Sequence, residues 1–137
     1  MKRTVIERET ERGSAGVKLM IVLTIIILAA HAGYNYVPVA YNAASLKSDI
    51  DAAILQGMAL PGRVSPVDNV RERIQKALIV NQIPTGAMLD VKQAGSAGAL
   101  TAHVSYMQPV NLLPFGMYKY NYAFDYTATP TGFLLKQ

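Results

Sequence analysis

The sequence predicts an α+β protein with an N-terminal transmembrane helix or stalk, a second amphipathic helix and an antiparallel sheet of three to four strands. Three observations support this prediction. An almost unbroken apolar run extends from Lys18 to Ala32, apolar residues then follow a helical spacing up to Asn81, and strict alternation begins after Gly86. The chain has 137 residues, which suffices for one membrane segment and one small domain.

The apolar run predicts a transmembrane helix over residues 17–37, preceded by a cytoplasmic tail over residues 1–16. At about 1.5 Å per residue, this helix crosses roughly 30 Å, the thickness of the hydrocarbon layer. Basic residues gather before the run, and the next one after it is Lys47. The positive-inside rule therefore predicts a cytoplasmic N-terminus with residues 38–137 on the other side; in a bacterium these are the inner (cytoplasmic) membrane and the periplasm. The side chains expected at the membrane interfaces are Lys18, Tyr34, Tyr36 and Tyr41.

The same N-terminal region fits two other interpretations. Residues 1–32 have the basic start, the short apolar core and the Ala30-His31-Ala32 pattern of a cleaved secretory signal peptide. The run also resembles the N-terminus of type IV prepilins and pseudopilins. Arg12-Gly13 stands where their leader ends, and Leu19 to Val22 and Leu28 to Ala30 match their apolar helix.

Lys18 departs from this pilin pattern. Pilins carry a glutamate at the matching position, and it pairs with the N-terminal amine of a neighbouring subunit inside the filament. A lysine repels that amine, so the resemblance implies a filament-type helix that has become a permanent anchor.

Beyond the anchor, the sequence predicts two helices. Pro38 is expected to kink or restart the first helix, which then continues to about Met58 and is broken by Pro61-Gly62. Ser65 and Pro66 form a helix start, and the second helix should end near Asn81. Its predicted buried face consists of Val67, Val70, Ile74 and Leu78.

Alternating residues then predict an antiparallel meander with one buried face. Its strands are expected over residues 89–92, 100–107 and 118–127, with a short last strand over residues 133–136. Five aromatic residues alternate along the third strand, and we expect them on the core face, packed by the two helices. These residues are Tyr118, Tyr120, Tyr122, Phe124 and Tyr126.

This layout resembles a family of small uncharacterised single-pass bacterial membrane proteins with a pilin-like anchor. The matching pieces are Val37-Pro38, Val104-Ser105-Tyr106, Pro114-Phe115-Gly116 and Phe124-Asp125. The resemblance implies a pilin-like fold and topology. It implies no activity, because the function of that family is unknown.

Few residues are candidates for a functional site. His31 is the only ionisable group between Lys18 and Lys47, so it is a candidate cofactor ligand, for a haem or a chlorophyll magnesium, or else a hydrogen-bonding group. No cofactor is expected overall, and His31 and His103 lie too far apart in the sequence for a zinc motif. The loop around residues 109–117 is unusually apolar, and its partner-contact candidates are Leu112, Leu113, Phe115 and Met117. They could fold over the core, dip into the membrane surface or enter a partner's groove.

The sequence favours no enzymatic activity and no metal site. It has no cysteine, no Gly-rich phosphate loop and no Ser/His/Asp pattern in a recognisable context. The net charge of +4 is spread over the chain, which excludes a nucleic-acid-binding face, and no small-molecule substrate is evident. The carboxylates are expected at helix caps and polar faces: Asp49, Asp51, Asp68, Glu72, Asp90 and Asp125.

These observations favour a non-enzymatic accessory or structural subunit of a larger membrane complex, of a respiratory or photosynthetic kind. Its expected partners are membrane lipid and other integral membrane subunits. The alternatives are a pilin-like or pseudopilin component of a filament or secretion system, and a periplasmic binding module released by signal cleavage.

Overall fold

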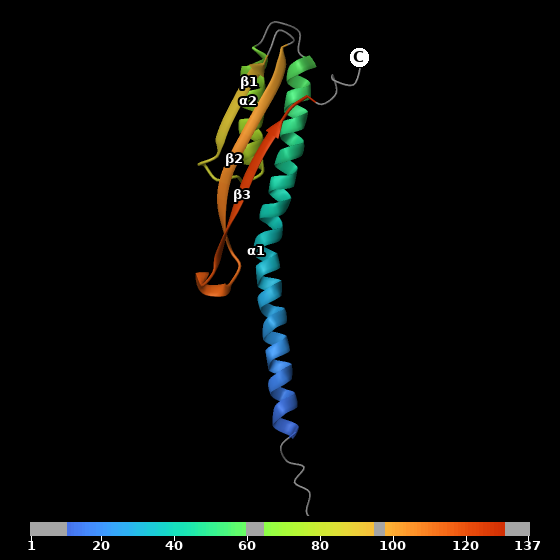
Figure 1. Cartoon of the computed structure of the whole chain (residues 1–137), viewed down its shortest axis with the longest axis vertical. Helices are drawn as coiled ribbons and strands as arrows, with labels where there is room; N and C mark the ends of the chain where they lie inside the picture. The colour runs from blue at the N-terminus through green and yellow to red at the C-terminus, as the bar shows by residue number, and fades with distance from the viewer. Residues whose placement is uncertain (1–10, 60–64, 95–97, 131–137) are drawn as a thin grey trace, which may run out of the picture.

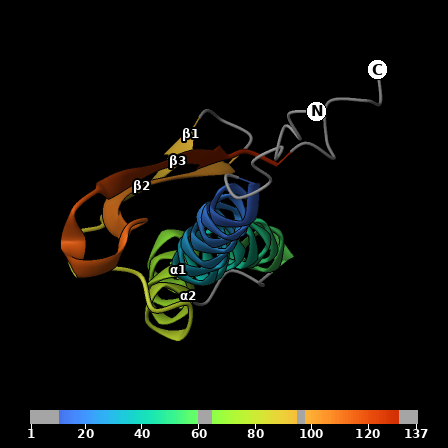
Figure 2. The ribbon, with the colours of Figure 1, turned by 90° about the horizontal axis from the view of Figure 1, so that it is seen from below.

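The computed structural model describes residues 11–59, 65–94 and 98–130. Two helices cover one face of a three-stranded sheet, and the N-terminal half of the first helix extends far beyond the sheet (Figure 1). Figure 2 shows both helices on the same side of the sheet. This confirms the α+β prediction. The elements are α1 (Glu11–Ala59), α2 (Pro66–Val80), β1 (Met88–Ala94), β2 (Ala99–Asn111), the short 3-10 helix η1 (Pro114–Gly116) and β3 (Lys119–Ala128).

Helix α1 is a single element of 49 residues. Its described part starts at Glu11 and continues through Pro38, so the predicted restart of the helix at that proline is wrong. Proline has no N–H to donate to the carbonyl of Tyr34. Residues 36–38 are exposed, so that carbonyl lies in a region where other donors can reach it.

The two halves of α1 have different surroundings. No side chain described between residues 15 and 38 is buried, and we call this segment the bare half. Residues 39–59 form the packed half, in which buried side chains recur every three or four residues. The buried residues are Val39, Ala43, Leu46, Ile50, Ala53 and Ile54.

Helix α2 lies against the packed half of α1. It starts after Ser65 and ends at Val80 with Asn81 as its C-cap, close to the predicted end, although the Ser65 side chain makes no capping hydrogen bond. Val70 and Ile74 are fully buried. Gly57 allows this close approach, because a Cβ there would lie 2.3 Å from Cγ2 of Val70.

The sheet is an antiparallel meander with strand order β1-β2-β3, which confirms the predicted topology. Strand β1 pairs with β2 only between Ala99 and Ser105, whereas β3 pairs with β2 as far as Asn111. The hairpin of β2 and β3 is therefore two-stranded over residues 107–123, and we call this part the overhang. The predicted last strand and the Pro61-Gly62 break lie outside the described residues.

The core is formed where α1, α2 and the sheet meet. Leu46, Ile50, Val70 and Ile74 from the helices pack with inward side chains of β2 and β3. The predicted aromatic stripe along β3 only partly belongs to this core. Phe124 is buried and Tyr122 and Tyr126 are half-buried, whereas the two residues nearest the tip of the hairpin, Tyr118 and Tyr120, are exposed.

Candidate membrane and partner surfaces

The bare half of α1 presents an apolar surface on all of its sides. Every large apolar side chain from Val17 to Ile27 is 50–69% exposed. Between Leu19 and Ile27, Thr24 is the only polar side chain, and its hydroxyl donates to the Met20 carbonyl at 2.8 Å. By length and composition, α1 is the one helix among the described residues that can cross a membrane. A helix that is apolar all round requires lipid or other helices around it.

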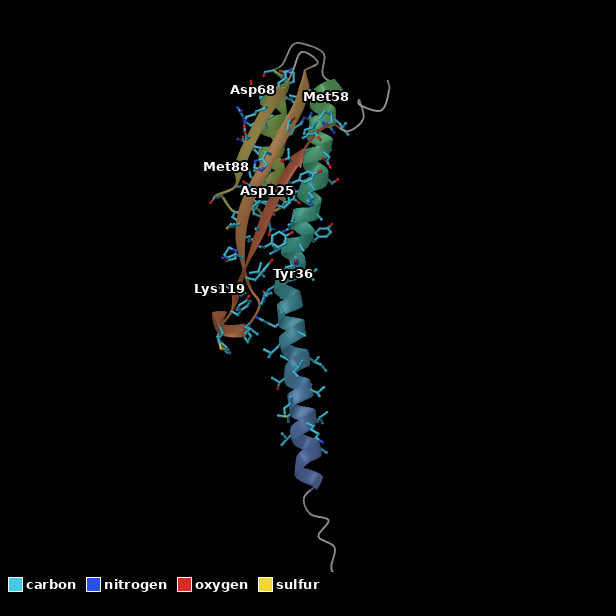
Figure 3. The ribbon with its side chains drawn as sticks, viewed as in Figure 1. Tyr36, Met58, Asp68, Met88, Lys119 and Asp125 are labelled. Carbon is cyan, nitrogen blue, oxygen red and sulfur yellow. The ribbon has the colours of Figure 1, made fainter. Side chains whose placement is uncertain are left out.

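The predicted interface residues lie at the two ends of this apolar surface. Lys18 is exposed at its N-terminal end. Tyr34 and Tyr41 are 81% and 72% exposed, so no part of the described chain holds their rings. Tyr36 instead faces the overhang, where its ring centroid lies 6.3 Å from that of Tyr120 and 6.0 Å from that of Tyr122. Figure 3 shows Tyr36 on α1 beside the lower part of the hairpin.

His31 is held by its own helix. Asn35 Nδ2 lies 3.2 Å from His31 Nε2 and also donates to the His31 carbonyl at 3.1 Å. Donation to Nε2 occupies the lone pair that a haem iron or a magnesium would need. The arrangement therefore favours the hydrogen-bonding interpretation of His31 over the cofactor ligand.

The tip of the overhang contains all four partner-contact candidates. The N–H groups of Leu112 and Leu113 donate to the Tyr118 carbonyl at 3.1 and 3.4 Å, which closes the loop. Both leucine side chains are half-buried. The side chains of Phe115 and Met117 point outward and are 97% and 72% exposed.

Phe115 adopts an unfavourable backbone conformation. Its φ of 60° lies in the left-handed region, which costs a bulky residue about 1–3 kcal/mol. Gly116, with φ of 70°, adopts the same region without that cost. The backbone at Phe115 is thus strained while its ring makes almost no contact within the described chain.

The packed half of α1, α2 and the sheet together form a small domain, which we call the head. Two carboxylates that the sequence placed on polar faces connect elements of this head. Tyr126 on β3 donates its hydroxyl to Asp51 on α1 at 2.9 Å. Burial, followed by this hydrogen bond, raises the pKa of Tyr126 above its ordinary value. Asn81 at the end of α2 donates to Asp49 at 2.8 Å. Sequence periodicity gave no signal for either pair, because each joins segments far apart in the chain.

The outer face of the sheet, opposite the helices, carries polar and apolar side chains. His103 on β2 and Asp125 on β3 are directly bonded, with Nε2 and Oδ1 at 3.0 Å. Met88 and Met107 are exposed on the same face. Nowhere in the described part of the chain do three His, Asp or Glu side chains gather as metal ligands.

Comparison with known proteins adds no relative. No family model, no curated protein and no solved structure matches this chain.

Proposed function

We propose that this protein is a single-pass membrane protein whose periplasmic head is a non-enzymatic docking subunit of a larger membrane complex. The observation that carries the proposal is the division of α1 into an apolar bare half and a half that is packed into a small domain. The first property suits lipid, and the second suits a folded domain in water. The excess of basic residues before the bare half supports a cytoplasmic N-terminus.

The outer sheet face is the surface that we assign to docking. It is covered by neither helix (Figure 2), and the exposed side chains of Met88 and Met107 are flexible apolar groups that adapt to a partner. Helices α1 and α2 pack against the opposite face of the sheet. A small head of this kind binds a partner through shape and apolar contact rather than through reactive groups.

Extraction of the full chain from its own membrane in mild detergent tests this proposal. The tagged protein should migrate with a larger assembly, and Met107→Lys should release it. Ile79→Lys is the matched control, because Ile79 on α2 is similarly exposed, at 78% against 71%, but does not belong to the sheet. A lone monomer, or equal effects of both variants, would contradict the docking role.

A pilin-like filament or secretion component is the second candidate. A long helix with a bare N-terminal half, joined to an antiparallel sheet, also suits a subunit whose apolar helices assemble into a bundle. Lys18 counts against it, because a lysine at this position repels the N-terminal amine of a neighbouring subunit. This candidate requires cleavage after Gly13, so an intact Met1 in the mature protein, found by N-terminal sequencing, would exclude it.

A further inference from the structure

The overhang brings a second apolar element close to the end of the bare half. Tyr36 holds the hairpin against α1 through its contacts with Tyr120 and Tyr122. Figure 1 shows β2 and β3 continuing from there past the rest of the head, toward the N-terminus of α1, with η1 at the lowest point. The tip therefore lies on the side of the head that faces the proposed membrane.

Standard dimensions give the level of the tip along α1. Gly116 lies four residues before Tyr120, and this segment joins the turn to the start of β3. It covers about 10 Å, less than the roughly 13 Å of four fully extended residues. The same distance along a helix corresponds to about seven residues. The tip thus reaches the level of about Ala30, where the apolar run of α1 ends and is followed by the polar residues His31 and Asn35.

The composition of the tip suits a lipid surface. Between His103 and Asp125 the chain holds a single charged residue, Lys119, and no carboxylate. No carboxylate therefore has to leave water or meet lipid phosphates, while a lysine at this depth attracts them. Tyr118 is exposed beside the tip, and Tyr34 and Tyr41 are exposed on α1, as in the aromatic belt of a membrane protein.

The conformation of Phe115 points to the same partner. Its ring is almost fully exposed in a strained left-handed turn, and no contact with a described residue offsets that strain. Phe115 is the middle residue of η1 at the tip of the hairpin, so its exposed ring lies outside the core of the head. Strain that persists without a contact inside the chain indicates a contact outside it.

We infer that the hairpin tip, through Phe115 and Met117, inserts into the outer leaflet at the boundary between the headgroups and the acyl chains. The partner is the lipid surface itself. This inference rests on the proposed membrane span, because the depth of the tip is set by α1. It gives the head a second point of attachment to the membrane.

Tryptophan fluorescence tests the inference directly, because the chain contains no tryptophan. The full chain carrying Phe115→Trp is reconstituted into phosphatidylcholine vesicles with lipids brominated at different depths along the acyl chain. We expect a shift of the emission to shorter wavelength and loss of most of the intensity with lipids brominated near the headgroup. Met117→Trp provides a second reporter in case the turn does not tolerate the larger ring.

Two control positions separate the failure of this inference from failure of the span. Met107→Trp on the outer sheet face should emit as in water and remain unquenched. Ile26→Trp in the bare half should be quenched by deeply brominated lipids. If only Ile26→Trp is quenched, the tip inference is wrong and the span remains. If none of the four reporters is quenched, the span and the tip inference both fail. If the tip reporters are shielded only in native membranes and not in lipid vesicles, the partner is a protein and the lipid inference is overturned.

Discussion

The two halves of α1 belong to one continuous helix, yet they meet opposite surroundings. The bare half is apolar on every side between Leu19 and Ala30, where it carries no ionisable residue. The packed half is apolar on one stripe only and carries Asp49 and Asp51 toward other elements. Helical character is therefore the same in both, and the distribution of polar groups around the axis decides what surrounds each half.

The largest effect is expected when one side chain is truncated in each half. Ile50→Ala removes a fully buried side chain and should lower the free energy of unfolding of the head by about 2–5 kcal/mol. Ile26→Ala leaves that free energy unchanged, because Ile26 touches no part of the head's core. Urea unfolding in detergent, followed by near-ultraviolet circular dichroism of the tyrosines, measures both. Similar losses in the two variants would show that the halves are not independent.

The second test uses alkaline pH. Tyr106 lies in the core, its ring stacked on Phe124 at 4.9 Å between centroids, and its buried hydroxyl has no hydrogen-bond partner among the described residues. Burial raises the pKa of Tyr106 from 10.0 to about 12. Its neutral form is favoured in the folded state, so the stability it contributes is complete below pH 10 and is lost as the pH rises toward 12.

The expected loss near pH 12 is about 2–3 kcal/mol, from 1.36 kcal/mol per pKa unit. Urea unfolding of the wild type and Tyr106→Phe at both ends of this range should show the loss in the wild type and a smaller loss in the variant. The span has no titratable side chain between Leu19 and Ala30, so α1 should stay in the membrane fraction while the head unfolds. Release of the chain into the supernatant would contradict the anchor.

The third test compares a glycine in each half. Gly57→Ala forces a Cβ against Val70 and should destabilise the head by about 1–3 kcal/mol. Gly33→Ala meets nothing within 4 Å, so it should leave the thermal midpoint of the head unchanged. Thermal unfolding of the two variants in the same detergent decides the matter, and equal midpoints would mean that α1 and α2 separate more easily than their packing suggests.

The smallest effect is expected at the outer sheet face. His103→Gln removes an exposed contact with Asp125, and such contacts contribute less than about 1 kcal/mol. The midpoint of urea unfolding should therefore move only slightly. A large loss of stability would place His103 among the residues that hold the head together, and would weaken the assignment of that face to docking.

The sequence predicted the elements whose periodicity is strong. Helix α2, the meander and the buried stripe of the packed half follow from spacing alone. The continuity of α1 through Pro38 did not follow. The rule that proline interrupts a helix considers that residue alone and not the helical segments that precede and follow it. The Asp51–Tyr126 and Asp49–Asn81 pairs did not follow either, because they depend on how distant elements meet.

The aromatic stripe on β3 shows a different limit. Alternation correctly placed Tyr120, Tyr122, Phe124 and Tyr126 on one face of β3, whereas Tyr118 lies just before the strand. Alternation carries no information on how far the covering helices extend. Phe124 lies under the core and is buried, while Tyr118 lies in the overhang beyond it and is exposed. The apolar tip was visible in the sequence as a candidate surface. The position of the tip beside α1 could not be predicted, because it depends on the register in which β2 and β3 pair.

The unbroken course of α1 through Pro38 has a mechanical consequence. From the level of the tip to Ala59, the helix extends for about 40 Å, and under the proposed membrane span this part is a lever arm whose base lies at the bilayer. A tilt of about 20°, which is typical of membrane helices, displaces the far end by about 14 Å. Under the proposed span, a change in bilayer thickness that alters this tilt would therefore also move the outer sheet face of the head.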